Sequence, residues 1–235
     1  SFKTICAYAE DSAVVHYIAK KDSAKEIRPE GFLLVDSGGH YRFEGTTDIT
    51  RTISLGVPTD EERKVYTTVL KGNLRLMDTV FPEGFKGCLL DGIAEEALWE
   101  EGYFCGHGIG HGVGCYLSVH ESEARISRSE GSREVAFRPG VIVSDEPGVY
   151  IEGRFGVRLE NLLLVEKAGQ IDGHRMCRFS PLTLVPFDRE SIDLKLLSDK
   201  EKDILYGYNQ NILDNIGPML DDGTLAWLKE NIDIK

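Results

Sequence analysis

Four acidic side chains and one histidine in this sequence offer the donor atoms of a divalent-metal site. They are Asp36 at the end of the apolar segment 31–36, Asp48 in segment 47–55, His111 in GHGIGHGVG, Glu146 in SDEPGVY and Glu160 in VRLEN. Taken singly, most have an ordinary structural interpretation, because an Asp at a strand end or an acid before Pro-Gly usually belongs to a turn. Glu160 is harder to explain in that way, since it lies in an apolar strand-like segment where an unpaired carboxylate is costly to bury.

As a set, these five side chains favour a dinuclear site. Four carboxylates and one imidazole can hold two divalent cations, with bridging carboxylates and a remaining position for water. Oxygen ligands with a single nitrogen favour manganese, cobalt or zinc over copper or a thiolate-bound structural zinc.

The segment 104–123 holds three of the six histidines, His107, His111 and His120. Its glycines do not fit G-x-G-x-x-G, so a phosphate-binding loop is unsupported, and Ala124 breaks the H-E-x-x-H pattern that starts at His120. Glycines here allow the backbone to pass close to a metal centre or a ligand. The alternative is a surface loop with solvated histidines, which three clustered histidines disfavour.

The elements that position these residues alternate between strands and helices. Apolar or alternating segments predict strands at 31–36, 47–55, 141–145, 157–165 and 182–186. A capping box at Thr59 opens a helix that we expect to be stopped by Pro82-Glu83-Gly84, and a second helix is predicted over about 89–101. Another capping box at Ser198 opens a helix that ends at Gly217-Pro218, and a short helix follows. This order predicts an α+β domain with a largely antiparallel sheet.

Composition narrows the classes of partner and compartment. The 235 residues carry a formal net charge of −12, which disfavours nucleic acid and anionic membrane surfaces as partners. No apolar run approaches the roughly 18 residues that a membrane span needs. Five scattered cysteines without a C-x-x-C pair indicate reduced thiols and a cytoplasmic protein. The chain lacks an initiator Met, so we expect a fragment of a longer protein.

Five blocks in order resemble the pita-bread metallopeptidases, the family of methionine aminopeptidase, prolidase and aminopeptidase P. These blocks are VVHY, VDSGG…GTTDITRT, GHGIGHGVG…VHE, DEPGVY and FGVRLEN, running from His16 to Asn161. The tail from Phe179 onward resembles the C-terminal extension of the long, three-domain Xaa-Pro aminopeptidases. The resemblance implies a curved, mainly antiparallel sheet, a catalytic domain over residues 1–186 and a helical extension over 187–235. It also implies helices before the first segment that this chain lacks, so we expect an N-terminally truncated domain.

The resemblance further implies a role for each matching position. Asp36 would bind one metal, His111 and Glu146 the other, and Asp48 and Glu160 would bridge two divalent ions, with Mn²⁺ expected and Zn²⁺ or Co²⁺ as alternatives. Glu146 would also act as general base, and Arg158 would orient the bridging carboxylates. His120 and His16 would support the substrate carbonyl, and His107 would line the pocket near the proline. The implied reaction removes the residue in front of a proline from a peptide.

Three other interpretations stay open at this stage. A prolidase would act on free X-Pro dipeptides, although the long-type tail disfavours it. A non-catalytic peptide-binding module is possible in this fold, but such relatives typically lose the ligands that stand here. A domain that chiefly dimerises through its C-terminal helices is compatible with an enzyme. Apolar sheet surface exposed by the missing helices favours self-association, and we expect a homodimer.

Overall fold

The described β-structure consists of two larger antiparallel sheets and two two-stranded units. The computed structural model describes residues 1–116, 118–128 and 135–233. The first sheet has the order β1-β2-β5 and the larger sheet has the order β6-β13-β12-β9-β7-β8. Their strands are β1 Ile5–Tyr8, β2 Phe32–Ser37 and β5 Ile49–Ser54 in the first sheet, and β6 Val80–Pro82, β7 Gly110–Gly112, β8 Ser122–Ile126, β9 Ile142–Asp145, β12 Asn161–Ile171 and β13 His174–Pro181 in the second.

Smaller elements connect these sheets. The hairpin β10 (Gly148–Ile151) and β11 (Phe155–Arg158) lies in the chain between β9 and β12 of the larger sheet, and β3 (His40–Tyr41) pairs with β4 (Gly45–Thr46) between β2 and β5. Short 3-10 turns cover Ala9–Ala13, Gly87–Leu89, Arg189–Ser191 and Gly217–Met219. The strand pairings among the described residues are antiparallel. The prediction of an α+β domain with an antiparallel sheet is therefore confirmed.

Helix α1 (Asp60–Met77) begins where the sequence indicates. Thr59 accepts a hydrogen bond from the Glu62 amide through its hydroxyl, and the Glu62 carboxylate accepts one from the Thr59 amide, which completes the capping box. The helix ends at Met77, earlier than predicted, because Val80–Pro82 forms β6 and pairs with β13. A Cβ on Gly72 would lie 2.6 Å from the Ala94 carbonyl oxygen, so glycine is needed where α2 (Asp91–Glu100) crosses α1.

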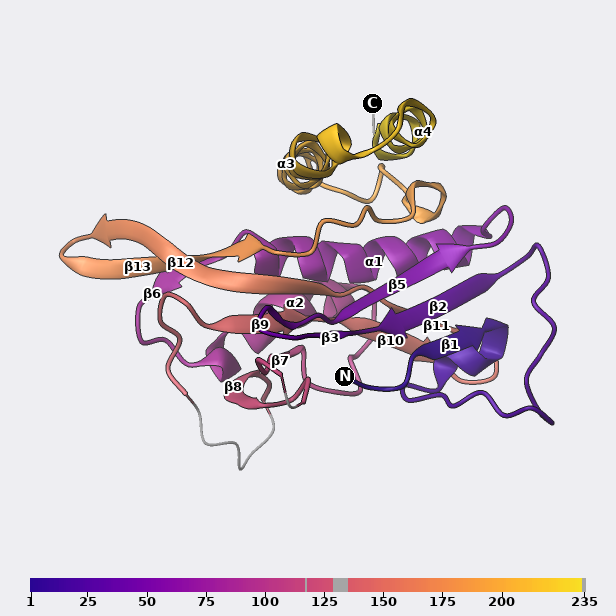
Figure 1. Cartoon of the computed structure of the whole chain (residues 1–235), viewed down its shortest axis with the longest axis horizontal. Helices are drawn as coiled ribbons and strands as arrows, with labels where there is room; N and C mark the ends of the chain where they lie inside the picture. Colours follow the sequence, from indigo (N-terminus) through magenta and orange to yellow (C-terminus); the bar gives the residue numbers. More distant parts are fainter. Residues whose placement is uncertain (117, 129–134, 234–235) are drawn as a thin grey trace.

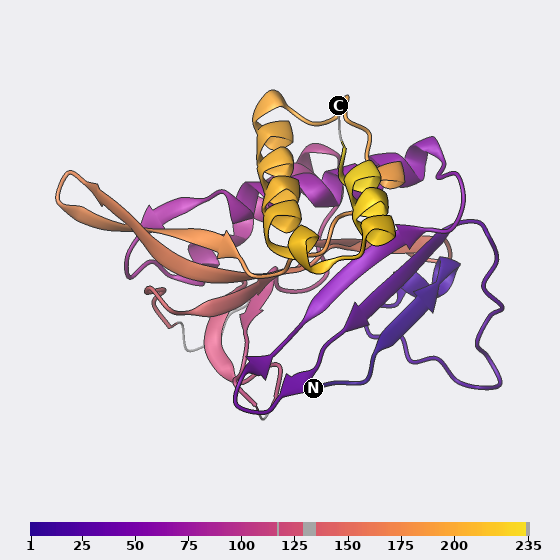
Figure 2. The ribbon, with the colours of Figure 1, turned by 45° about the horizontal axis from the view of Figure 1, so that its top comes forward.

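The C-terminal helices α3 (Asp199–Ile216) and α4 (Asp222–Ile232) form the outermost layer. Figure 1 shows them above α1, with the strands below it, and Figure 2 shows both helices lying in front of α1. The second predicted capping box is present, since the Ser198 hydroxyl accepts from the Glu201 amide and the Glu201 carboxylate accepts from the Ser198 amide. Leu205, Tyr208 and Leu228 from these helices are buried in the same cluster as the α1 side chains.

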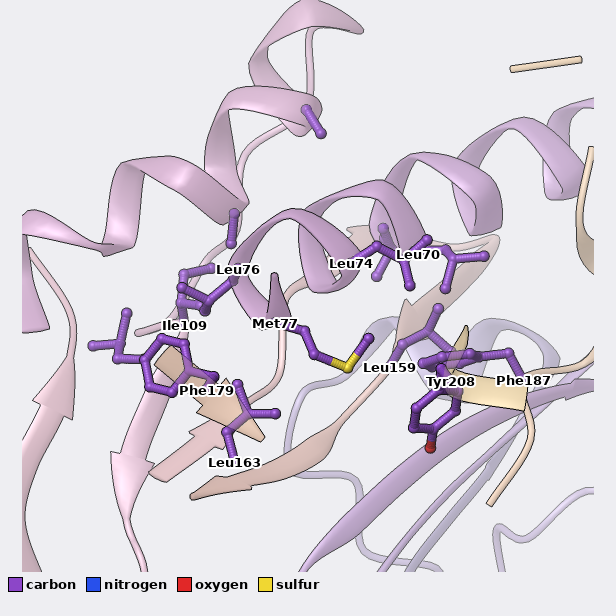
Figure 3. Close-up of a cluster of buried hydrophobic side chains, with 14 of the residues drawn as sticks. Leu70, Leu74, Leu76, Met77, Ile109, Leu159, Leu163, Phe179, Phe187 and Tyr208 are labelled. Atoms are coloured by element: carbon purple, nitrogen blue, oxygen red, sulfur yellow. The ribbon is translucent and has the colours of Figure 1, made fainter. Parts of the chain in front are cut away.

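This shared hydrophobic core supports the sheets from the side of α1. In Figure 3, Leu70, Leu74 and Met77 point from α1 toward Leu159 and Tyr208. Both leucines have no exposed surface. Burying a leucine contributes about 1.5–3 kcal/mol, so this face of α1 holds the sheets and the C-terminal helices together.

Three details of the predicted strands are wrong. Segment 182–186 is not a strand, because the ladder with β12 is made by β13, which ends at Pro181; among the described residues only the Leu182 amide continues it, by donating to the Leu162 carbonyl oxygen at 2.8 Å. The predicted strand 157–165 is interrupted at Leu159-Glu160, which separates β11 from β12. Asp48 precedes β5 instead of lying inside a strand. In the described part of the chain, every helix is too short or too polar to cross a membrane.

Replacing Leu74 by Ala tests the contribution of this core. The substitution leaves a cavity against Leu159 and Tyr208, so we expect the free energy of unfolding to fall by about 2–5 kcal/mol. Leu89, which is 56% exposed, is the matched control, and Leu89→Ala should change stability by less than about 0.5 kcal/mol. Equal effects of the two substitutions in denaturant titrations would contradict this account of the core.

Candidate metal centre

One cavity of about 540 Å³ brings together the side chains singled out in the sequence. Its lining includes all nine of the predicted residues: His16, Asp36, Asp48, His107, His111, His120, Glu146, Arg158 and Glu160. These residues are up to 144 positions apart in the chain, so the fold and not local sequence places them together. Their chemical roles remain predictions.

The five proposed ligands come from five separate segments. Asp36 lies in β2 on the buried face that also carries Phe32 and Leu34, following the alternation of a strand. Asp48 lies just before β5, and His111 is in β7. Glu146 follows β9, and Glu160 lies in the break between β11 and β12.

His111 stands at the centre of this group. One ligand atom each of Asp48, His111 and Glu160 lie within 4.8 Å of one another. His111 Nε2 is 3.4 Å from Asp48 Oδ2 and 3.2 Å from Glu146 Oε1. Its Nδ1 lies 3.1 Å from the Gly112 carbonyl oxygen, and a carbonyl only accepts, so Nδ1 carries the proton of the neutral ring. Nε2 is thereby left to face the carboxylates as a metal ligand would.

Two carboxylate oxygens of the group lack a hydrogen bond. Asp36 Oδ1 and Glu160 Oε1 are buried and have no partner among the described residues. Their other oxygens are occupied, since Arg158 donates to Asp36 Oδ2 at 2.7 Å and Thr50 donates to Glu160 Oε2 at 2.8 Å. Buried polar atoms are normally satisfied, so two unsatisfied carboxylate oxygens in the lining of this cavity fit a site for hard divalent cations.

Arg158 acts on the carboxylates in two ways. Its guanidinium contacts Asp36 directly, and it reaches Glu160 through Thr50, whose hydroxyl accepts from Arg158 Nε at 3.1 Å. The family resemblance implies that Arg158 orients the bridging carboxylates, whereas its direct carboxylate partner in the structure is Asp36. Arg158 is 2% exposed, so this is a fully buried charged contact.

Burial shifts the protonation of the acidic cluster. Loss of water raises the pKa of Glu146 to about 7, although the charges of His111 and Arg158 oppose the shift. Burial, and then the neighbouring carboxylates, raise the pKa of Glu160 well above its usual range. Burial opposes protonation of His111, but its hydrogen bond to Asp48 and the charge of Glu146 outweigh this and raise its pKa. Without cations, the cluster therefore favours binding protons.

His107 is held by a chain of hydrogen bonds from Arg158. Arg158 donates to the Tyr150 hydroxyl at 2.8 Å, and that hydroxyl lies 2.8 Å from His107 Nε2. His107 Nδ1 lies 2.9 Å from the Gly108 carbonyl oxygen, so Nδ1 carries the proton and Nε2 accepts from Tyr150. Burial lowers the pKa of His107 to about 4, which keeps the ring neutral. Both ring nitrogens are thus occupied by protein partners.

The other two histidines lie at more open positions of the cavity. The ring of His120 meets that of His111 edge to face, with centroids 4.1 Å apart. Burial, and then the charge of His111, lower the pKa of His120. His16 is exposed and lines the same cavity. Both side chains are placed to meet a molecule that enters it.

Several residues around the proposed metal ligands were not predicted from the sequence. Ser144 accepts from the His111 amide at 2.9 Å and donates to Glu146 Oε1 at 3.0 Å, so it links two proposed ligands. Thr50 and Tyr150 complete the contacts of Arg158. Arg125 lines the cavity and pairs with His111 across β7 and β8. The available signal was a polar residue in a strand-like segment close to a candidate ligand, such as Thr50, two positions after Asp48.

Comparison with known proteins agrees with this geometry. Residues 1–167 match metallopeptidase family M24, and residues 175–233 match the C-terminal region of peptidase M24. The chain belongs to metallopeptidase family M24. A probable Xaa-Pro aminopeptidase P from Fusarium vanettenii is 42% identical over 234 residues, covering 97% of this chain and 38% of that protein.

Solved structures give the same family and fold. The X-prolyl aminopeptidase of Caenorhabditis elegans, a cytosolic enzyme with a di-nuclear active site, superposes with a TM-score of 0.92 at 34% identity, over 99% of this chain and 38% of that one. A prolidase from Pyrococcus furiosus superposes with a TM-score of 0.61 at 35% identity, over 69% of this chain and 46% of that one. The expected pita-bread fold is therefore confirmed, and the chain spans under two-fifths of the length of the Fusarium and Caenorhabditis aminopeptidases.

The raised carboxyl pKa values predict how the metal-free chain responds to pH. A carboxyl with a raised pKa binds more protons folded than unfolded, so its contribution lowers stability as pH rises toward the folded value. His107 and His120, whose pKa values are lowered, act oppositely, chiefly below their unfolded pKa of 6.5. Between about pH 6.5 and about pH 8, deprotonation of Glu146 alone should lower the free energy of unfolding by about 1 kcal/mol.

Thermal unfolding in chelator measures this effect. The melting temperature should fall over that window, with Asp145, whose pKa burial also raises, adding to the fall. Glu146→Gln should flatten the pH dependence, whereas Glu152→Gln at an exposed position should not. A melting temperature that is constant or rises across the window would contradict the assignment.

Proposed function

We propose that this chain is the catalytic part of a dinuclear Xaa-Pro aminopeptidase, which releases the N-terminal residue from peptides with proline in second position. The observation that carries the proposal is the convergence of four carboxylates and His111 in one cavity, with two buried oxygens unsatisfied. Similarity to Xaa-Pro aminopeptidases over nearly the whole chain supports the choice of substrate.

The proposed ligand assignment divides the five side chains between two divalent ions. Asp36 would bind one ion, His111 and Glu146 the other, and Asp48 and Glu160 would bridge them. We propose Mn²⁺ as the native ion, with Zn²⁺ or Co²⁺ as alternatives, because oxygen donors with one imidazole suit all three. Bound ions of this kind lower the pKa of water and polarise a carbonyl group.

Glu146 is the proposed carrier of the proton. It takes a proton from the water that attacks the scissile carbonyl and delivers it to the proline nitrogen, which must be protonated to leave as an amine. The Ser144 hydroxyl, 3.0 Å from Glu146 Oε1, fixes the orientation of this carboxylate. An X-Pro bond lacks an N–H, so this route depends on no hydrogen bond from the substrate amide.

The histidines would position the peptide around the reacting carbonyl. His120 and His16, at the more open positions, would donate to the carbonyl oxygen and to the tetrahedral intermediate. His107 would form the wall of the proline pocket, since both its nitrogens already have protein partners. Arg158 would fix Asp36 and, through Tyr150, the plane of His107.

Arg125 favours one alternative, a prolidase that acts on free dipeptides. It is an exposed cation in the cavity lining, directly across the ladder from His111, so its side chain lies on the face of the proposed ligand. A guanidinium there could bind the carboxylate of an X-Pro dipeptide. The similarity of residues 175–233 to an M24 C-terminal region, together with the coverage by aminopeptidases, supports the first candidate instead.

We further propose a cytoplasmic homodimer in which residues 1–186 carry the metal site and residues 187–235 form the helical extension. Five free cysteines and the cytosolic worm relative support the location. Exposed apolar side chains on and beside the C-terminal helices, Tyr206, Met219 and Trp227, support self-association at that surface.

An assay on proline peptides tests the function. After metal removal and return of Mn²⁺, the full-length protein should cleave X-Pro-Pro tripeptides and should cleave X-Pro dipeptides at a rate at least about tenfold lower, a factor worth about 1.4 kcal/mol. A preference for dipeptides that Arg125→Met abolishes would establish the prolidase alternative. Absence of cleavage with Mn²⁺, Zn²⁺ and Co²⁺ would reject both.

Substitutions separate the proposed roles. Glu146→Gln should lower kcat by about 10²–10⁴, the usual contribution of a general base, without loss of helical circular dichroism. Asp48→Ala should lower metal content as well as activity. His120→Ala should lower kcat more than metal content, and equal losses of both would make His120 a ligand. Full activity of Asp48→Ala would contradict the ligand set.

A further inference from the structure

The break between β11 and β12 leaves the backbone of Glu160 without ladder partners. Residues of β5 supply them instead. The Glu160 amide donates to the Thr50 carbonyl oxygen at 3.0 Å, and the Glu160 carbonyl accepts from an Arg51 terminal nitrogen (Nη1) at 2.5 Å. The Thr50 hydroxyl also holds the Glu160 carboxylate. Two adjacent residues thus fix Glu160 at three points.

Arg51 is in turn enclosed by oxygen atoms. Arg51 is 6% exposed, and its guanidinium donates six hydrogen bonds to other described residues. The acceptors are the carbonyls of Thr50, Glu160, Val185 and Pro186, the side-chain oxygen of Asn161 and the hydroxyl of Tyr208. All six are neutral. A buried cation held only by neutral dipoles depends on the full set, because each lost partner leaves a charged donor unsatisfied.

Half of this enclosure comes from the segment beyond β13. Val185 O lies 2.7 Å and Pro186 O 3.1 Å from Arg51, and the Phe187 ring lies 4.4 Å from the guanidinium carbon. Tyr208 of α3 accepts from Arg51 at 3.1 Å, and its hydroxyl lies 2.8 Å from Val185 O. With a single proton to give, Tyr208 joins Arg51 to the Val185 carbonyl and closes the enclosure.

We propose that Arg51 and Tyr208 are positioning residues that set Glu160 in the metal site, and that the C-terminal segment contributes to metal affinity through them. This rests on the proposed metal-binding role of Glu160. The Tyr208 hydroxyl accepts a hydrogen bond from Arg51, and Arg51 donates to the Glu160 carbonyl oxygen. Because these bonds fix the backbone of Glu160, they also fix where its side-chain carboxylate lies. The segment 185–208 is then part of the metal site's support, although none of its residues is a proposed ligand.

Titration of the metal-free chain with Mn²⁺ tests this inference, with bound ion followed by calorimetry and by electron paramagnetic resonance. Tyr208→Phe removes one hydroxyl and keeps the ring against Phe187. It should weaken Mn²⁺ binding about tenfold, and Arg51→Lys should weaken it about 10- to 100-fold, as substitutions behind a ligand usually do. The spectrum of the coupled ion pair should change in both variants.

Tyr66→Phe is the matched control. Tyr66 is also fully buried, and its hydroxyl accepts from the Asp188 amide at 2.8 Å, so it joins α1 to the same segment without a hydrogen bond to Arg51. Both variants should lose similar thermal stability, but Tyr66→Phe should bind Mn²⁺ like the wild type. Equal Mn²⁺ affinity of the two variants would overturn the inference. A wild-type chain that binds no Mn²⁺, Zn²⁺ or Co²⁺ would instead overturn the proposed function. If Arg51→Lys does not fold, the comparison of the two tyrosine variants still decides.

Discussion

Four carboxylates share a single cavity with one imidazole, and the mutual repulsion of these largely buried groups is the constraint around which this domain is organised. Two unit charges about 4 Å apart interact by about 4 kcal/mol at the effective dielectric of a protein surface. Arg158 contributes one compensating charge, on Asp36. The negative charge of the other carboxylates must be neutralised by protons or by cations. The unsatisfied oxygens of Asp36 and Glu160 are positions where a cation could bind.

The same constraint bears on Asp48, Glu146 and Glu160, the three proposed ligands that lie just outside strands. A residue at a strand end or break is freed from strict alternation and can aim its side chain out of the ladder. Its backbone groups then need other partners. The Glu146 amide donates to the Ile109 carbonyl at 2.8 Å, and the Glu160 amide donates to Thr50. The backbones of Glu146 and Glu160 are thus held by residues next to β7 and within β5, which keeps these two carboxylates fixed despite their repulsion.

Several helix starts and candidate ligands can be predicted from the sequence, and the features that cannot be predicted have physical causes. Capping boxes at Thr59 and Ser198 fixed two helix starts because they are local hydrogen bonds. Glu160 and Asp48 stood out because an unpaired carboxylate is costly to bury in an apolar segment, whereas the full set of five was predicted from the residue types together and from the family resemblance. The break at Leu159-Glu160 was missed because its partners lie more than 100 residues away, in β5. Segment 182–186 has the composition of a strand, but its backbone instead serves Arg51 and Tyr208.

The proposed ligands are divided between the two sheets. Asp36 and Asp48 belong to the three-stranded side, and His111 and Glu146 belong to the six-stranded side. An ion bound by both sets would join the two sheets, so metal binding and the packing of the sheets would stabilise each other. Stability would then rise by about 1.4 kcal/mol for each tenfold excess of free ion over its dissociation constant. The folded lifetime of such a protein would follow the metal supply of its surroundings.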